Sequence, residues 1–132
     1  MIAACDCYVS LHRSEGLGLS IAEAMYLERP AIATAYGGNL DFMNMNNSLL
    51  VRYDLVELER DYSPYEKGSV WAEPDVEHAA KLMRWVYDHP HEARDTGKRA
   101  SMYVRQSLDP LLASQEIRMR LEEIRRRLVS LP

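Results

Sequence analysis

The stretch between Ser10 and Tyr36 places the narrowest limits on the fold. An apolar run ending near Leu11 is followed by a glycine-bearing turn, and helix-forming residues then occupy Ile21–Leu27. A proline turn separates this segment from a second apolar run at Ala31–Thr34. Strand, turn, helix and strand within so few residues predict a βαβ crossover, the repeating unit of a parallel sheet. Ligands of such units collect where the first strand ends and the helix begins.

The composition is that of an ordinary globular domain. The chain has 132 residues, of which 47% are apolar and 27% charged, enough for one domain with its own core. The net charge of −4 argues against a general nucleic-acid binder, which needs a basic surface. Because no apolar run is long enough to span a bilayer and the N-terminus lacks a signal peptide's basic start, we expect a cytoplasmic protein.

The two cysteines, Cys5 and Cys7, are one residue apart. In an extended segment their side chains point to opposite faces, which disfavours a disulfide between them. No cluster of histidine or cysteine elsewhere in the sequence completes a metal site. We therefore expect no bound metal and two buried, reduced thiols.

The chain continues with a third apolar run and then loses its periodicity. A short helical piece is predicted at Leu40–Met45 and a third strand at Leu49–Val51. We interpret residues 52–71 as a long surface loop with one extended piece at Leu55–Leu58. The aromatic residues of this loop either line a ligand pocket or anchor the loop to the body.

The second half of the chain is predicted to be helical. Apolar stripes at helical spacing, bounded by aspartate and proline, indicate three helices. They run from Asp75, the predicted N-cap, to His89, over Glu92–Ser107, and from about Leu111 to Leu128. The expected fold is therefore α/β, a single Rossmann-like domain over residues 1–132 with helices flanking a parallel sheet.

The turn before the first predicted helix has the chemistry of a phosphate site. Backbone N–H groups at a helix N-terminus lack helical acceptors and, with the helix dipole, attract phosphate oxygens. Gly16 and Gly18 allow close approach of a ligand, and Glu23, expected in the first helical turn, can accept hydrogen bonds from a ribose diol. The spacing matches neither a Rossmann GxGxxG sequence nor a P-loop.

A purely structural interpretation fits the same residues. Ser20 and Glu23 have the spacing of a capping box, in which each side chain satisfies a backbone N–H of the other residue. Glu15 would then be an ordinary solvated loop residue. The spacing alone leaves both interpretations open.

The ordered string from Ser10 to Met43 resembles the retaining glycosyltransferases of the GT-B fold, specifically family 4. The resemblance runs from about Asp6 to Val51, and residues 71–75 look like a continuation found in a bacterial subgroup. Its markers are Glu15 and Glu23, with seven residues between them, Ala24-Met25, Pro30–Thr34, Gly37-Gly38 and Asp41.

The resemblance implies a role for each matching position. Glu15 would contact the donor sugar and act in catalysis, and Glu23 would bind the ribose. Gly37 and Gly38 would shape a loop beside the pocket. For Asp41 we favour a stabilising position at a helix N-terminus over a ligand contact. The expected donor-binding residues are Glu15, Gly16, Leu17, Gly18, Leu19 and Glu23, where Leu17 replaces the family's usual phenylalanine. Arg13 would face phosphate or brace the loop.

The implied activity is transfer from a nucleoside-diphosphate sugar to the hydroxyl of a saccharide or lipid-linked saccharide, with retention of configuration. The sequence has no Asp-x-Asp motif, so neither a metal nor a cofactor is implied. The resemblance further implies bacterial polysaccharide or lipopolysaccharide synthesis. The alternative is a nucleotide-sugar-binding or interaction domain without chemistry.

The resemblance covers only the later part of the donor-binding half of a GT-B enzyme. An N-terminal GT-B domain would then be a missing partner, the chain alone would be inactive, and its open sheet edge would favour self-association. The run Arg125-Arg126-Arg127 is either a solvated helix face or a contact to the inner face of the membrane.

Overall fold

The computed structural model describes residues 1–129. In chain order the elements are η1 (Ile2–Ala4), β1 (Tyr8–Ser10), α1 (Leu19–Tyr26), β2 (Ala31–Thr34), η2 (Gly38–Asp41), β3 (Leu49–Val51), β4 (Tyr53–Glu57), β5 (Val70–Pro74), α2 (Val76–Asp88), α3 (Pro90–Ser107) and α4 (Pro110–Val129). The predicted α/β class and the predicted βαβ crossover are confirmed.

A parallel sheet of three strands forms the centre, in the order β1-β2-β3. Ile32 of β2 pairs with Val9 on one side and with Leu49 on the other. All four residues of β2 are buried, as expected of a parallel strand covered on both faces. Strand β1 is an edge strand, and Val9 is 37% exposed.

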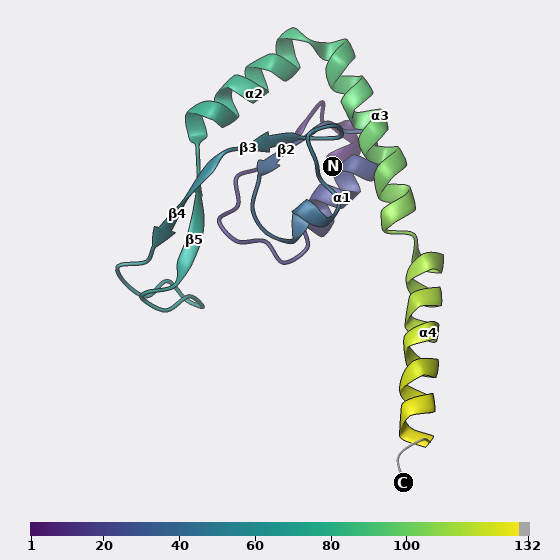
Figure 1. The fold of residues 1–132 in the computed structure, drawn as a ribbon. Coiled ribbons are helices and arrows are strands. Elements are labelled where there is room, and N and C mark those ends of the chain that lie inside the picture. Colours follow the sequence, from purple (N-terminus) through teal and green to yellow (C-terminus); the bar gives the residue numbers. More distant parts are fainter. Residues whose placement is uncertain (130–132) are drawn as a thin grey trace.

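Side-chain alternation along β2 divides the core into two layers. Ala31 and Ala33 face Ile21 and Met25 of α1 together with residues of α3. Ile32 faces the opposite way, towards a smaller cluster that includes α2. Helices α1 and α3 therefore cover one face of the sheet and α2 the other (Figure 1).

Helix α3 approaches the turn after α1 more closely than a side chain would permit. A Cβ on Gly97 would lie 2.2 Å from the carbonyl oxygen of Glu28. One turn on, the Ser101 hydroxyl donates to the carbonyl of Tyr26 at 2.9 Å, and the Arg105 guanidinium lies 3.6 Å from the centre of the Tyr26 ring. The turn after α1 is thus tied to α3 by packing and by hydrogen bonds.

The prediction that residues 52–71 form a surface loop is wrong in its main feature, because β4 and the start of β5 lie within this stretch. Strands β4 and β5 form an antiparallel ribbon that extends away from the parallel sheet (Figure 1). Most of β4 is exposed, so its side chains carry no alternating apolar pattern that would reveal a strand. Tyr62 and Tyr65 lie 5.2 and 6.2 Å from Trp71, measured between ring centres. These aromatic rings anchor the connecting loop to β5.

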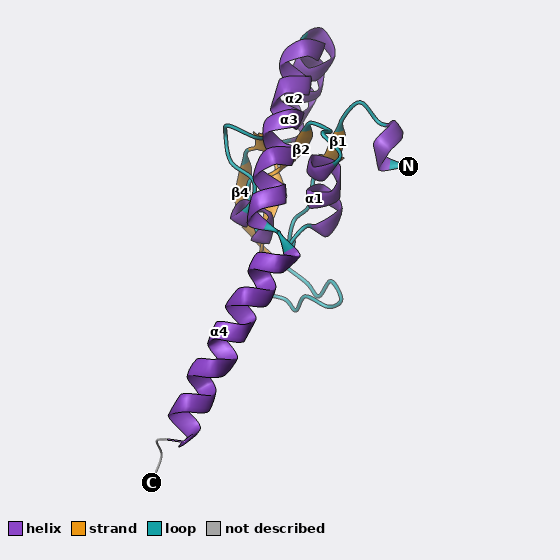
Figure 2. Ribbon diagram, turned by 90° about the vertical axis from the view of Figure 1, so that its right-hand side faces the viewer, coloured by secondary structure: helices purple, strands orange, loops and turns teal. Residues whose placement is uncertain are grey.

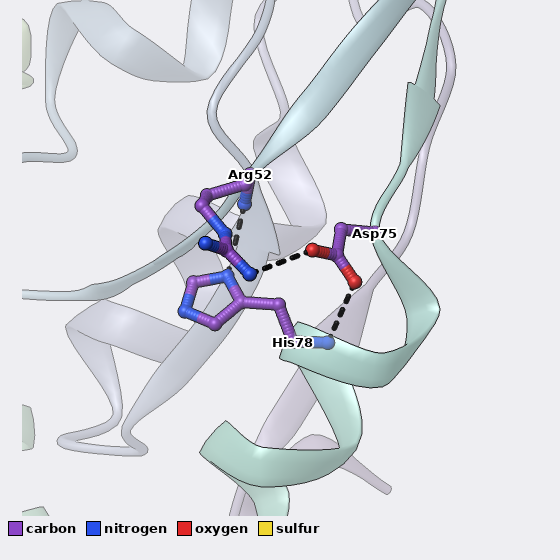
Figure 3. Close-up of polar contacts among 3 residues, drawn as sticks. All are labelled: Arg52, Asp75 and His78. Atoms are coloured by element: carbon purple, nitrogen blue, oxygen red, sulfur yellow. Dashed lines mark hydrogen bonds and ion pairs between the residues drawn. The ribbon is translucent and has the colours of Figure 1, made fainter.

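The predicted helices of the second half are confirmed, and Asp75 is the N-cap of α2. Its carboxylate accepts from the backbone N–H of His78 at 2.8 Å and from the Arg52 guanidinium at 2.8 Å (Figure 3). The helical piece predicted at Leu40–Met45 is instead the short 3-10 helix η2, with Asp41 at its end.

Helix α4 projects from the rest of the chain as a single rod (Figure 2). Asp109 accepts a hydrogen bond from the N–H of Leu111 at 2.8 Å, next to the start of the helix. Within residues 1–129, no helix has both the length and the apolar character needed to cross a membrane.

Both cysteines are free. Cys7 is partly buried, and burial raises the pKa of its thiol to about 11. Cys5 is exposed, so the expectation of two buried thiols is wrong for this residue. It lies just after η1, before the sheet begins.

Candidate functional site

The candidate site is formed by the two loops that leave the carboxyl ends of β1 and β2. The backbone N–H of Gly38 donates to the carbonyl of Glu15 at 3.0 Å. The Nε2–H of His12 donates to the carbonyl of Tyr36 at 2.8 Å, and the hydroxyl of Ser10 lies 3.1 Å from Nδ1 of the same ring. The loop before α1 and the loop after β2 are therefore held together as one unit.

Two glycines make this contact between loops sterically feasible. Gly37 has φ +103°, in the left-handed region, and a Cβ there would lie 2.6 Å from the carbonyl oxygen of Glu15. A Cβ on Gly38 would lie 1.8 Å from the carbonyl oxygen of Gly16. Any other residue at either position would push the two loops apart.

Helix α1 begins two residues earlier than the capping box requires. Gly18 is the N-cap with φ +85°, and its carbonyl accepts the first helical hydrogen bond, from Ala22. Ser20 lies inside the helix, and its hydroxyl oxygen accepts from the hydroxyl of Tyr8 at 3.0 Å. The capping-box interpretation is therefore wrong. The first-turn amides, which start at Leu19, have no acceptor within the helix.

Glu15 is half-buried and takes part in the turn itself. Its Oε1 accepts from the backbone N–H of Gly18 at 3.0 Å. The alternative in which Glu15 is an ordinary solvated residue is thus wrong. The amide of Gly18, one of those expected to face a donor, is already paired with this carboxylate. The second oxygen of the Glu15 carboxylate is a further hydrogen-bond acceptor at the site.

Glu23 lies in the second turn of α1 and not in the first, as we expected, because the helix begins two residues earlier. It is the fifth residue of the helix and is exposed. Its carboxylate forms no hydrogen bond or ion pair with any residue of the described range 1–129. Nearby, the apolar side chains of Leu17 and Leu19 are exposed at the mouth of the loop. The site is therefore an open surface, on which the carboxylate of Glu15 is hydrogen-bonded within the loop and that of Glu23 is not.

Asn39 lies directly beneath the loop, and the sequence reasoning missed it. It is completely buried, its amide donates to the carbonyl of Thr34 at 3.1 Å, and a Cβ on Gly18 would lie 3.4 Å from its own Cβ. The Oδ1 of Asn39 and the hydroxyl of Thr34 are buried without a hydrogen-bond partner among the described residues. The signal in the sequence was the position of Asn39 directly after Gly37-Gly38, at the candidate site. Its unpaired oxygen is notable because buried amide groups are normally hydrogen-bonded.

Arg13 braces the loop against the ribbon. Its guanidinium forms two hydrogen bonds with the carboxylate of Glu73, at 2.6 and 2.7 Å, and lies 5.1 Å from the centre of the Trp71 ring. Its carbonyl also accepts from the N–H of Ala72 at 3.0 Å. Hydrogen bonding to Arg13 holds the pKa of Glu73 below its ordinary value. Of the two predicted roles, this geometry favours bracing over phosphate contact.

The ribbon is tied to the sheet at a second place, the start of α2. Hydrogen bonding to the backbone N–H of His78, and then the charge of Arg52, hold the pKa of Asp75 below its ordinary value (Figure 3). The Tyr36 and Tyr53 rings, at 5.2 Å between centres, link the ribbon to the loop after β2. A cleft of about 490 Å³ opens beside this ribbon and is lined by Arg13 and Trp71 but not by Glu15 or Glu23.

Comparison with solved structures shows which larger fold this arrangement belongs to. Three structures of HepE from Anabaena match over 92% of this chain. The complex with UDP and glucose has a TM-score of 0.70 at 19% identity, that with UDP-glucose 0.69 at 19%, and that with UDP 0.67 at 20%. The chain spans 28–29% of the HepE chains. The likeness shows a shared fold, which is the Rossmann-like C-terminal part of the GT-B architecture.

No curated protein matches the chain. The profile of the family described as glycosyl transferases group 1 matches residues 1–102. This range contains β1, α1, β2 and both loops of the candidate site, together with the ribbon that braces them. The chain therefore belongs to the family of glycosyl transferases group 1.

Proposed function

We propose that this chain is the donor-binding part of a retaining glycosyltransferase of family 4, and that it binds a nucleoside-diphosphate sugar at the loop before α1. The observation that carries this proposal is the start of α1. The N-cap is Gly18, which has no side chain to accept from them, so the amides of the first turn remain unpaired at the carboxyl end of a parallel strand. Such amides, together with the helix dipole, bind phosphate oxygens.

The two glutamates have different parts in this proposal. Glu23 binds the ribose hydroxyls, which is supported by its exposed and uncommitted carboxylate one turn into α1. Glu15 contacts the donor sugar through the oxygen that does not pair with Gly18, and helps hold the sugar for transfer. Since the HepE structures contain UDP and UDP-glucose, uridine nucleotides are the first donors to test.

The proposed reaction exchanges one bond at the anomeric carbon for another. The acceptor hydroxyl oxygen forms a bond to this carbon, the bond from the carbon to the diphosphate breaks, and the acceptor proton is released. The nucleoside diphosphate leaves with the bonding electrons, and the anomeric configuration is retained. Amides held in place by the loop contacts stabilise the charge that builds on the leaving group.

The wider proposal follows the resemblance. It includes a saccharide or lipid-linked saccharide acceptor, an N-terminal GT-B domain as partner, transfer without a metal or cofactor, and a place in bacterial polysaccharide or lipopolysaccharide synthesis. The open edge of β1 also supports self-association of this chain, for which a monomer in light scattering would be the opposing result.

Ligand-observed NMR with a panel of UDP, GDP and ADP tests donor binding. We expect saturation transfer to the ribose of one nucleotide and its loss in Glu23→Gln. Glu28→Gln removes the same charge at the opposite end of α1 and should leave the signal intact. Absence of binding to every nucleotide, or equal binding by Glu23→Gln, would contradict the proposed site.

A non-catalytic nucleotide-binding domain is the second candidate, and the pairing of Glu15 with Gly18 favours it. Glu15→Gln keeps an acceptor oxygen for that pairing, whereas Glu15→Ala removes it. In the full-length gene product, loss of sugar transfer by Glu15→Gln with unchanged nucleotide binding supports catalysis. Nucleotide binding without transfer by the unaltered protein supports the second candidate. The 132-residue chain alone is expected to show no transfer.

A further inference from the structure

Asn39 is completely buried beneath the loop before α1, and its amide oxygen has no hydrogen-bond partner among residues 1–129. The amide nitrogen, in contrast, donates to the carbonyl of Thr34 at 3.1 Å and to the sulfur of Met43 at 3.3 Å. A buried oxygen without a partner is rare, because it gives up its hydrogen bonds to water and gains none in the protein. Packing alone therefore does not account for this oxygen.

The side chain of Asn39 lies against Gly18, the N-cap of α1. A Cβ built on Gly18 would lie 3.4 Å from the Cβ of Asn39. The first N–H groups of a helix have no acceptor within the helix. A free acceptor and the backbone N–H groups at the start of α1 are thus neighbours in the interior of the protein.

The N–H of Gly18 already has one acceptor, the Oε1 of Glu15 at 3.0 Å. In the proposed function the same carboxylate contacts the donor sugar. Because a carboxylate can accept through both of its oxygens, two adjacent hydroxyls of a sugar ring can engage Glu15 completely and draw Oε1 away from Gly18. The N–H of Gly18 then needs a second acceptor if Gly18 is to keep its place at the start of α1.

We propose that Asn39 is a positioning residue for the donor, and that its Oδ1 accepts the N–H of Gly18 when a sugar engages Glu15. The exchange requires a rotation of the peptide group between Leu17 and Gly18, which the wide φ range of glycine permits. The hydrogen bond gained at Asn39 offsets the one lost at Glu15. The role of the sugar rests on the proposed function, whereas the second acceptor does not.

Contacts between the two loops confine this exchange to a small part of the site. The carbonyl of Glu15 accepts from the N–H of Gly38 at 3.0 Å, and the backbone of Gly16 lies so close to Gly38 that a Cβ there would be 1.8 Å from its carbonyl oxygen. Asn39 follows Gly38 directly, so the loop after β2 carries the second acceptor. The Glu15 side chain and the peptide group before Gly18 are the parts that move.

Hydrogen exchange at the Gly18 amide, measured by NMR, tests the second acceptor without any ligand. We expect this amide to be protected in the unaltered 132-residue chain and in Asn39→Leu, where Glu15 still accepts. We also expect protection in Glu15→Ala, where Asn39 takes its place. The double variant has neither acceptor, and its Gly18 amide is expected to exchange about tenfold faster. Loss of protection in Glu15→Ala alone would overturn the proposal.

Thr34→Val is the matched control for the loss of a buried polar group. The Thr34 hydroxyl is also buried without a partner among the described residues, and valine replaces it at nearly the same volume. Thr34 is not among the three closest neighbours of a Cβ on Gly18, whereas Asn39 is. Thr34→Val combined with Glu15→Ala is therefore expected to leave the Gly18 amide protected. The amide spectrum of each variant verifies that the fold is intact.

Titration with UDP and with UDP-glucose tests the role of the sugar. UDP leaves Glu15 on Gly18, so Asn39→Leu is expected to bind UDP as tightly as the unaltered chain does. UDP-glucose draws Glu15 away, so its affinity is expected to fall about fivefold in Asn39→Leu and to stay unchanged in Thr34→Val. An equal loss of affinity for both ligands in Asn39→Leu would mean that Asn39 only supports the fold, and would overturn the proposal.

The failure of this inference is distinguishable from that of the proposed function. Binding of neither ligand to the unaltered chain would contradict the proposed function and the role of the sugar, and the exchange rate of the Gly18 amide would still test the second acceptor. Binding of UDP and UDP-glucose with the same affinity ratio in Asn39→Leu as in the unaltered chain would overturn this inference alone.

Discussion

Helices α1 and α4 are held in place in opposite ways. α1 has only eight residues, yet four of them are buried against β2 and α3. α4 has 20 residues, and none of those whose side chains are described is buried. An isolated helix of eight residues is not stable in water, whereas one of 20 approaches stability by its own hydrogen bonds. Tertiary packing therefore determines α1, and local sequence determines α4.

The β4–β5 ribbon is intermediate between these two cases. It is connected to the rest of the chain by the ion pairs Arg13–Glu73 and Arg52–Asp75 and by aromatic contacts, and few of its residues are buried. Exposed ion pairs contribute little to stability, so the ribbon is expected to open before the sheet does.

The same substitution in the two helices gives the largest contrast. Ile21→Ala, at a fully buried position of α1, is expected to lower the free energy of unfolding by about 2–5 kcal/mol through the cavity it leaves. Ile117→Ala, on α4, is expected to change it by less than about 0.5 kcal/mol. Urea unfolding measures both. Equal effects would show that α4 is part of the cooperative core.

Two glycine substitutions test how much close packing around α1 contributes to the free energy of unfolding. Gly97→Ala is expected to cost about 1–3 kcal/mol, because its Cβ would lie 2.2 Å from the Glu28 carbonyl, which outweighs alanine's better helix propensity. A Cβ on Gly16 meets nothing within 4 Å, so Gly16→Ala should be neutral in the same urea titration. A neutral Gly97→Ala would mean that α3 can move away from the turn without loss.

The N-cap of α2 tests the polar attachment of the ribbon. Asp75→Ala removes the hydrogen bond to His78 and the ion pair with Arg52, and should lower Tm by a few degrees. Asp75→Asn keeps a capping oxygen and should recover most of the loss. If both variants lose the same amount, the ion pair rather than the cap is the stabilising contact.

The Arg13–Glu73 pair is expected to have the smallest effect. Because the folded pKa of Glu73 lies below its unfolded value, the pair stabilises the protein above the unfolded pKa, and this contribution is lost as pH falls through the folded pKa. Since both side chains are about half exposed, the contribution is below about 1 kcal/mol. Thermal unfolding of Glu73→Gln across acidic pH should therefore show a slightly weaker pH dependence than the unaltered chain.

The sequence predicts best where one period dominates. The helical stripes of α2, α3 and α4 carry such a period, and the continuous apolar run Ala31–Thr34 marks a strand covered on both faces; all were predicted correctly. The ribbon was missed because an exposed strand needs no apolar alternation. At the site, the position of Glu15 in the turn was predictable, but its pairing with Gly18 was not, because it depends on the left-handed φ of that glycine.

The missing side chain at Gly97 also determines where α4 points. With no Cβ in the way, α3 rests directly on the turn after α1 and keeps a fixed direction relative to the donor loop. Only Leu108 and Asp109 separate α3 from α4, and the N–H of Leu108 and the carbonyl of Asp109 are both hydrogen-bonded. α4 therefore extends about 30 Å from a start that lies beside Tyr26, the last residue of α1. A partner that binds along α4 is thus held in a fixed direction relative to α1 and to the loop that precedes it.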